Sequence, residues 1–147
     1  MNLTNKQYIE ALLETDLSDY KNLKNLFNML KIYEREDFKH AHSLNKIVKK
    51  YSAKGSLGEE NIALFYQLYK ESYLFDAPYE FESYLMYVEW DREPSKRFYL
   101  PRRKQLKRVV DALQLLEDNE LDLLAISMPP GVGKTTIGCF FLSWIMG

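Results

Sequence analysis

The chain of 147 residues has the length of one ordinary domain, with 46% hydrophobic and 28% charged residues. This composition is typical of a folded globular protein and excludes a disordered one. The net charge of −1 gives no overall attraction to nucleic acid or membrane, so only local patches can supply it. Residues 1–6 lack an apolar signal core, and no run is long enough to span a bilayer. We therefore expect an intracellular protein without a membrane anchor.

Residues 1–58 carry the spacing of three amphipathic helices. Thr4 and Gln7 predict a capping box for the first helix, and Ser18 is the predicted cap of the second. A third helix is expected over residues 38–51, before a break at residues 53–58. The inward positions expected from this spacing are Tyr8, Ile9, Leu12 and Leu13 in the first helix, Tyr20, Leu23, Leu26, Phe27 and Leu30 in the second, and Phe38, Ala41, Leu44, Ile47, Val48 and Tyr51 in the third.

Two more helices are expected after the break, one from Glu59 and one starting at Asp76. Their many aromatic residues indicate either a partner-binding surface or the core of a small helical bundle. His40 and His42 are two residues apart and do not share a helix face, so no metal site is predicted there. A polar, proline-containing segment at residues 91–95 is the expected boundary between a helical region, residues 1–95, and a second domain, residues 96–147.

Seven of the thirteen residues from 96 to 108 are basic. Pro101 suits the first turn of a helix that continues to Leu116. The basic cluster has three open interpretations: a solvated helix face, part of a nucleotide site, or a contact to the DNA backbone. Gln105 is the more specific candidate for a nucleotide-binding residue in this segment. Its side-chain amide offers the donor and the acceptor that read the N6 and N7 edge of adenine. Phe98 or Tyr99 can stack on a base or pack in the core.

A short apolar run at residues 121–126 is followed by a loop with two glycines, Lys134, Thr135 and a second apolar stretch at residues 137–146. This pattern predicts a buried strand of a parallel sheet, a phosphate-binding loop and a helix. The fold class expected is therefore α/β, of the phosphate-loop NTPase type, preceded by a mostly helical region. The apolar helix is expected to be sunk in a core, with Cys139 as a buried thiol.

The predicted loop has the chemistry of a triphosphate site for ATP and Mg²⁺. Backbone N–H groups at the start of a helix form an anion nest, and glycine at 131 and 133 allows positive φ. Lys134 is placed to reach the β and γ phosphates and is the expected catalytic residue, and Thr135 can ligate Mg²⁺. The alternative is an ordinary strand–turn–helix that has an exposed lysine and binds no nucleotide. The predicted nucleotide-binding residues are Gln105, Gly131, Val132, Gly133, Lys134, Thr135 and Thr136.

The motif departs from the usual phosphate-loop pattern, because Met128 stands where a first glycine is expected. Pro129 and Pro130 can redirect the chain instead, since they fix φ and extend the residues before them. Only one strand is expected, and no later carboxylate follows to position Mg²⁺ and water. We therefore expect the chain to be the N-terminal part of a longer protein and not to hydrolyse ATP alone.

Three segments resemble the start of a bacteriophage terminase large subunit: FYLPRRKQ at 98–105, MPPGVGKTT at 128–136 and FLSWIMG at 141–147. The resemblance covers about a third of the chain. It implies an ATP-driven motor that packages double-stranded DNA into procapsids in the host cytoplasm, with a C-terminal nuclease in the intact protein. It also implies portal protein and small terminase subunit as partners, a working homo-oligomeric ring, and Gln105 as the adenine-recognising residue.

Two other classes share parts of the pattern. AAA+ ATPases also carry Pro-Pro-Gly-Val-Gly-Lys-Thr, usually with glycine where Met128 stands, and helicases use an upstream glutamine. The basic helix with Gln105 favours terminase. A non-enzyme alternative is that residues 1–95 form a docking module for a packaging partner.

Overall fold

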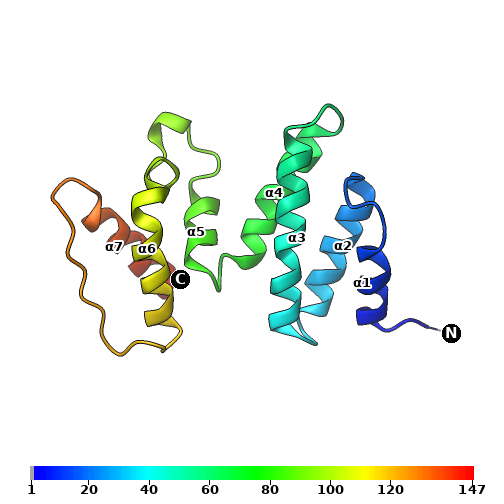
Figure 1. The fold of residues 1–147 in the computed structure, drawn as a ribbon, viewed down its shortest axis with the longest axis horizontal. Coiled ribbons are helices and arrows are strands. Elements are labelled where there is room, and N and C mark those ends of the chain that lie inside the picture. The colour runs from blue at the N-terminus through cyan, green and yellow to red at the C-terminus, as the bar shows by residue number, and fades with distance from the viewer. Residues whose placement is uncertain (1) are drawn as a thin grey trace. The chain divides into compact units, whose positions relative to one another are not determined.

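The structure is a computed structural model that describes residues 2–147 as helices joined by loops (Figure 1). It divides into two compact units, one ending at Phe75 and one running from Asp76 to Gly147. None of the helices within residues 2–147 has both the length and the apolar character that a membrane crossing requires.

The first unit is built from α1 (Asn5–Leu13), α2 (Tyr20–Tyr33), α3 (Phe38–Ser56) and α4 (Ile62–Asp76). The capping box of Thr4 and Gln7 is confirmed at the start of α1. The cap of α2 is Asp19 and not Ser18: the Asp19 carboxylate accepts from the Asn22 N–H at 3.3 Å. Ser18 instead donates to Asp16, because the turn before α2 is one residue longer than expected.

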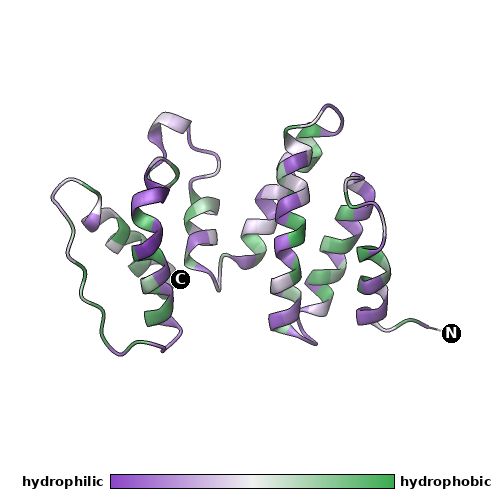
Figure 2. Cartoon of the chain, in the orientation of Figure 1, coloured by the Kyte–Doolittle hydropathy of each residue, from purple (hydrophilic) through white to green (hydrophobic). Residues whose placement is uncertain are grey.

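The core of the first unit is formed by apolar residues of these four helices, and Figure 2 colours hydrophobic residues green. The predicted break at residues 53–58 begins later, since α3 continues to Ser56. Gly55 lies in this last turn of α3, directly against the Phe65 ring, which leaves no room for a Cβ at position 55. The Asn45 amide donates to the Ser72 carbonyl at 2.8 Å and ties α3 to α4. The buried core residues are Ile9, Leu12, Leu17, Leu23, Leu26, Phe27, Leu30, Tyr33, Ala41, Val48, Phe65 and Leu68.

The second unit contains α5 (Phe81–Val88), the 3₁₀ turn η1 (Pro94–Lys96), α6 (Tyr99–Glu117) and α7 (Lys134–Met146). The helix expected from Asp76 begins only at Phe81, because Asp76 ends α4 and its carbonyl accepts from Tyr79 and Glu80 in a turn. The boundary expected at residues 91–95 lies inside this unit.

Helices α5 and α6 cap each other. The buried Glu89 carboxylate, directly after α5, accepts from the backbone N–H groups of Phe98 and Tyr99 at 2.6 and 2.8 Å. Near the end of α6, the Gln114 amide oxygen accepts from the Phe81 N–H at 2.7 Å, at the start of α5. These hydrogen bonds supply acceptors for N–H groups at the helix starts, which have no acceptor within their own helix. They fix where Phe98, at the entrance of α6, lies in the unit.

The α/β prediction is wrong for the described chain, because residues 2–147 contain no strand. Residues 121–130 run as irregular chain between α6 and α7 (Figure 1). Leu124, Ile126 and Met128 alternate onto the core of the second unit, whereas Leu123 is 85% exposed. This side-chain alternation is that of a strand. A strand also needs a neighbour to pair its N–H and C=O groups, and the other long segments of the described chain are helical.

Helix α7 is less buried than its composition predicts. Only Ile137 and Trp144 are buried on it, while Leu142 and Met146 are exposed. Cys139 is also exposed, so the predicted buried thiol is wrong. The reason is the missing sheet: α7 packs on α5 along one face only, through Phe81 and Trp144, whose ring centroids are 5.2 Å apart.

Candidate functional site

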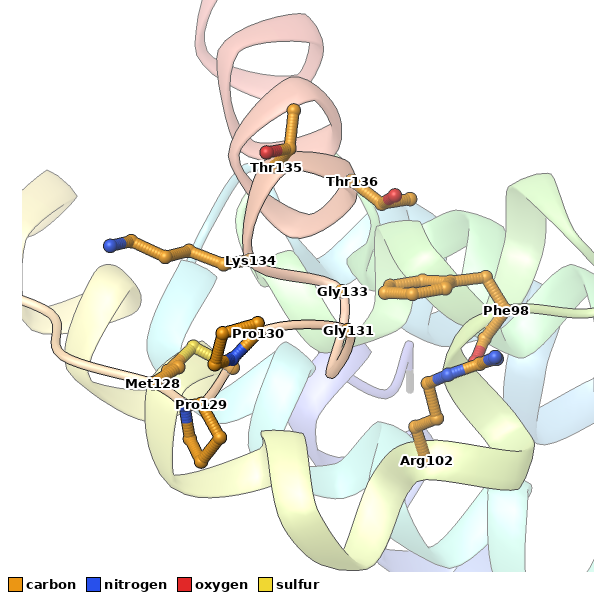
Figure 3. A pocket seen from close by; sticks show the side chains of 10 residues that line it. All are labelled: Phe98, Arg102, Met128, Pro129, Pro130, Gly131, Gly133, Lys134, Thr135 and Thr136. Atoms are coloured by element: carbon orange, nitrogen blue, oxygen red, sulfur yellow. The ribbon is translucent and has the colours of Figure 1, made fainter.

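A hollow of about 580 Å³ lies where residues 128–133 meet the start of α7 and the start of α6 (Figure 3). Most of the predicted loop lines it, together with two residues of the basic segment. The lining residues are Phe98, Arg102, Met128, Pro129, Pro130, Gly131, Gly133, Lys134, Thr135 and Thr136. The hollow is wide enough for a ligand of small-molecule size.

The turn into α7 depends on two glycines with positive φ. Gly131 has a backbone φ of 83° and Gly133 one of 95°. Residues other than glycine adopt such angles only at an energetic cost. Gly133 is also the N-cap of α7. A Cβ on Gly133 would lie 2.5 Å from Cε2 and Cζ of Phe98, whereas a Cβ on Gly131 would meet nothing within 4 Å. Glycine is therefore required at position 133 for two reasons: the backbone φ is positive, and the Phe98 ring leaves no room for a Cβ.

The first turn of α7 presents unpaired donors. Among the described residues, the backbone N–H groups of Lys134, Thr135 and Thr136 have no hydrogen-bond acceptor. All three residues are exposed, and the positive end of the helix dipole lies here. The Lys134 ammonium has no ion pair within residues 2–147, and in Figure 3 its side chain extends away from Phe98 and Arg102. An anion bound at this turn would gain N–H donors and a mobile positive charge.

The opposite wall of the hollow comes from the start of α6. The half-buried Phe98 ring stacks on Phe140 of α7, with centroids 6.0 Å apart and planes at 22°. The Arg102 guanidinium lies 5.0 Å from the Phe98 ring centroid and donates to the Phe98 carbonyl at 3.0 Å. Because Glu89 holds the Phe98 N–H, this wall is fixed by α5 as well. Neither the Glu89 cap nor the Phe98–Gly133 contact has a local sequence signal, since their partners are distant in the chain.

The predicted site residues do not all come together. Gly131, Gly133, Lys134, Thr135 and Thr136 line the hollow, and Val132, half-buried, does not. Gln105 is exposed on α6 and also outside the lining, although it follows Arg102 by three residues and so lies about one turn further along a neighbouring face. Tyr99 is fully buried, which leaves Phe98 as the aromatic residue at the hollow.

No protein-family model, curated protein or solved structure matches the chain.

The side chains that line the hollow include few possible ligands for Mg²⁺. Residues 2–147 contain no group of three or more His, Cys, Asp or Glu side chains arranged to hold a metal ion, and no carboxylate lines the hollow. The exposed Thr135 hydroxyl is a hard oxygen ligand of the kind Mg²⁺ accepts. A Mg²⁺ ion at the hollow would therefore have to be carried by a bound nucleotide, because the described lining offers hydroxyl oxygens and no carboxylate.

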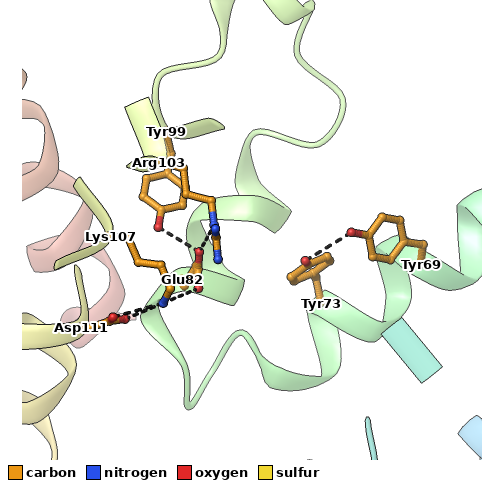
Figure 4. Close-up of polar contacts among 7 residues, drawn as sticks. All are labelled: Tyr69, Tyr73, Glu82, Tyr99, Arg103, Lys107 and Asp111. Carbon is orange, nitrogen blue, oxygen red and sulfur yellow. Dashed lines mark hydrogen bonds and ion pairs between the residues drawn. The ribbon is translucent and has the colours of Figure 1, made fainter. Parts of the chain in front are cut away.

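Two cations of the basic segment, Arg103 and Lys107, pair with a carboxylate of α5 and do not line the hollow. Glu82 of α5 accepts from the Tyr99 hydroxyl at 2.9 Å and from Arg103 Nε at 2.5 Å, with Lys107 Nζ at 3.3 Å (Figure 4). Burial alone would raise the pKa of the Glu82 carboxyl, but the hydrogen bonds from Arg103 and Tyr99 and the charges of Arg103 and Lys107 lower it below its usual value. Burial and the Glu82 charge raise the pKa of the Tyr99 phenol. Arg103 and Lys107 therefore join α6 to α5.

We expect Glu82→Gln to destabilise the second unit by about 1–3 kcal/mol at pH 7, because an amide cannot replace a charged acceptor of three donors. The pKa of Glu82 is depressed in the folded state, so its stabilisation is present above the unfolded value near 4.5 and is lost as pH falls through the folded value. Urea unfolding at pH 7 and at about pH 3 checks this, with the gap between wild type and variant closing in acid.

The matched control is Glu93→Gln, because the Glu93 carboxylate pairs with Lys96 while its side chain is 70% exposed. This substitution should change the unfolding free energy by less than about 0.5 kcal/mol. A Glu82→Gln effect as small as the control, or one that does not vary with pH, contradicts the role assigned to Glu82.

Proposed function

We propose that the hollow at the start of α7 binds the triphosphate of ATP, with Mg²⁺ carried on the phosphates. The observation that carries the proposal is the set of unpaired N–H groups on Lys134, Thr135 and Thr136 beside the positive-φ turn. Such a turn receives phosphate oxygens without needing a sheet behind it, since its donors come from the loop and helix alone.

Two cations flank the turn and are assigned different roles. Lys134, exposed and free of carboxylate partners within residues 2–147, is proposed to contact the β and γ phosphates. Arg102 is already bonded to the Phe98 carbonyl, so it contributes charge to the wall and not a mobile contact. Thr135 supplies the hydroxyl for Mg²⁺. Because no carboxylate lines the hollow, we expect this chain to bind ATP without rapid turnover.

The wider function that we propose is the nucleotide-binding part of a motor that packages double-stranded viral DNA in the host cytoplasm. Its support is the resemblance of residues 98–105, 128–136 and 141–147 to terminase large subunits. Under this proposal the partners are DNA, a portal protein and a small terminase subunit, and the working form is a homo-oligomeric ring.

The proposal is tested by measuring ATP binding to the full chain in Mg²⁺ by titration calorimetry. We expect Lys134→Ala to weaken ATP by about ten- to a hundredfold, because a charge-assisted contact to phosphate is worth about 1.5–3 kcal/mol. Lys104→Ala is the control, since Lys104 is exposed on α6 and does not line the hollow. Equal affinities for ATP and adenosine, or equal losses in both variants, would refute a triphosphate site.

Base recognition is a separate prediction. Gln105→Ala is expected to weaken ATP by about tenfold and GTP by much less, because the glutamine amide pairs with the N6 and N7 edge of adenine alone. Gln67→Ala, at an exposed glutamine of α4 in the first unit, serves as the control. Parallel losses for ATP and GTP in the Gln105 variant would remove Gln105 from the base site.

A further inference from the structure

Helix α3 has an unusual charge distribution. It contains five lysines and no aspartate or glutamate over its nineteen residues, in a chain whose net charge is −1. An ordinary solvated helix mixes both signs, which keeps it soluble and adds pairs at i, i+4. A single cation near the end of a helix is explained by the dipole, and that accounts for Lys54 only.

Four of these lysines share one face, which we call the lysine face: Lys39, Lys46, Lys50 and Lys54. At 100° per residue they lie within an arc of about 80°, and Ser43 is the only other residue of α3 inside it. All four are exposed. The buried residues of α3, which are Ala41, Asn45, Val48 and Ser52, lie on the opposite side. The lysine face therefore points to solvent from a helix that is fixed in the core.

Carboxylates within residues 2–147 do not neutralise the lysine face. Among the described residues, none of the four lysines pairs with a carboxylate. Lys50 and Lys54 each lie 5.7 Å from the centroid of the Tyr51 ring. The fifth lysine, Lys49, lies 4.5 Å from the Tyr73 ring centroid, beside the lysine face. The contacts with the Tyr51 ring restrain the side chains of Lys50 and Lys54 but do not neutralise their charges.

We propose that the lysine face of α3 is a contact surface for the phosphate backbone of double-stranded DNA. From Lys39 to Lys54 the helix rises about 22 Å, at 1.5 Å per residue. A duplex presents one phosphate per strand every ~3.4 Å, so this length faces about six base pairs. Over the last two turns of α3, one lysine per turn forms a regular row of positive charges. Such a row is complementary to the regular negative charges of a stiff duplex. Ion pairs between lysine ammonium groups and phosphates carry no sequence information, so we expect this binding to be independent of DNA sequence.

The composition of the lysine face argues against a lipid surface. A helix that lies in a membrane interface needs large apolar side chains next to its cations in order to insert between lipids. Within the arc of the lysine face the only residue of α3 besides lysine is Ser43, and the large side chains that flank the arc, Ile47 and Tyr51, are half-buried.

The DNA contact deepens the proposed packaging function by naming a surface for the DNA, but it does not depend on ATP binding. It lies in the first unit, on α3, whereas the hollow belongs to the second unit. The two can therefore fail separately. Duplex binding is measured without nucleotide, and ATP binding is measured without DNA.

The test is fluorescence anisotropy of the full chain with a labelled duplex of about 24 base pairs, over a range of salt. If the four lysines each contact one phosphate, the slope of log K against log[salt] is about −3.6. The triple variant Lys46→Gln, Lys50→Gln, Lys54→Gln should bind at least tenfold more weakly near 0.1 M salt, with a slope reduced in magnitude by about 2.7. Its ATP affinity should be unchanged.

Two controls separate the lysine face from net charge. Lys6, Lys21 and Lys31 are exposed lysines of α1 and α2, and replacing these three with glutamine removes the same charge but should weaken duplex binding less than about threefold. Arginine at positions 46, 50 and 54 should keep the affinity, because it keeps the charge. The proposal is overturned by equal losses in both glutamine triples or by an unchanged salt slope. It is also overturned if the chain binds phosphatidylserine-containing vesicles but no duplex.

Discussion

Replacing Trp144 with alanine is expected to lower the unfolding free energy of the second unit by about 3–5 kcal/mol. The Trp144 side chain is 8% exposed and packs against Phe81, with ring centroids 5.2 Å apart. Its indole N–H donates to the Ala77 carbonyl at 2.8 Å. Truncation removes one of the two aromatic contacts that α7 makes with Phe81, leaves a cavity beside Phe81, and leaves the Ala77 carbonyl without its donor.

The measurement is denaturant unfolding followed by circular dichroism and by the fluorescence of Trp90, which is the other tryptophan and is buried in the same unit. Trp144→Phe should cost about 1–2 kcal/mol, because a ring still fills most of the site while the hydrogen bond is lost. Leu142→Ala is the control on the same helix, since Leu142 is 55% exposed, and it should cost less than about 1 kcal/mol. Similar costs at 142 and 144 would show that Trp144 does not anchor α7.

The parts of the fold that the sequence predicts correctly are those set by local chemistry. The Thr4–Gln7 capping box and the buried leucines of α2 follow from residues three or four positions apart. The sequence predicts the cap of α2 one residue too early, at Ser18, because Ser18 and Asp19 are both good caps. The start of α5 was placed at Asp76 because proline commonly follows a helix start. The chain instead uses Asp76 as the last residue of α4.

The parts that the sequence does not predict depend on distant partners. Residues 121–126 have the apolar composition of a strand, but a sheet requires a second strand to pair with, and none occurs within residues 2–147. Without a sheet to cover it, Cys139 of α7 is exposed. The caps that Glu89 and Gln114 provide join residues 9 to 33 positions apart. No short sequence window contains both members of such a pair.

The candidate site divides in the same way. The glycines, Lys134 and Thr135 were predicted from their spacing, and they line the hollow because they are contiguous in the chain. The wall formed by Phe98 and Arg102 comes from a different helix, so their contact with the loop could not be read from the sequence. Side-chain chemistry alone predicts Gln105 as a site residue, and Gln105 lies outside the lining of the hollow. Position relative to the loop is a property of how α6 packs, and spacing does not encode it.

Alanine at position 133 is expected to weaken ATP binding far more than alanine at position 131. Both glycines have positive φ, and alanine in that region costs about 1–2 kcal/mol at either position. Only at Gly133 does the new Cβ meet Phe98, at 2.5 Å, which adds about 1–3 kcal/mol of overpacking. The loop conformation that binds phosphate becomes a minor state, and the apparent affinity falls with its population. We expect a loss of about tenfold for Gly131→Ala and of at least a hundredfold for Gly133→Ala, measured by titration calorimetry.

A double-mutant cycle isolates the contact between the two helices. Phe98→Ala removes the ring that the new Cβ would strike, so Gly133→Ala in that background should cost only the backbone strain that Gly131→Ala also costs. The coupling between positions 98 and 133 is then about 1–3 kcal/mol, whereas positions 98 and 131 should show none, because nothing lies within 4 Å of a Cβ at 131. If the two glycine positions respond alike in both backgrounds, the Phe98 wall does not shape the turn, and the loop alone sets the geometry of the hollow.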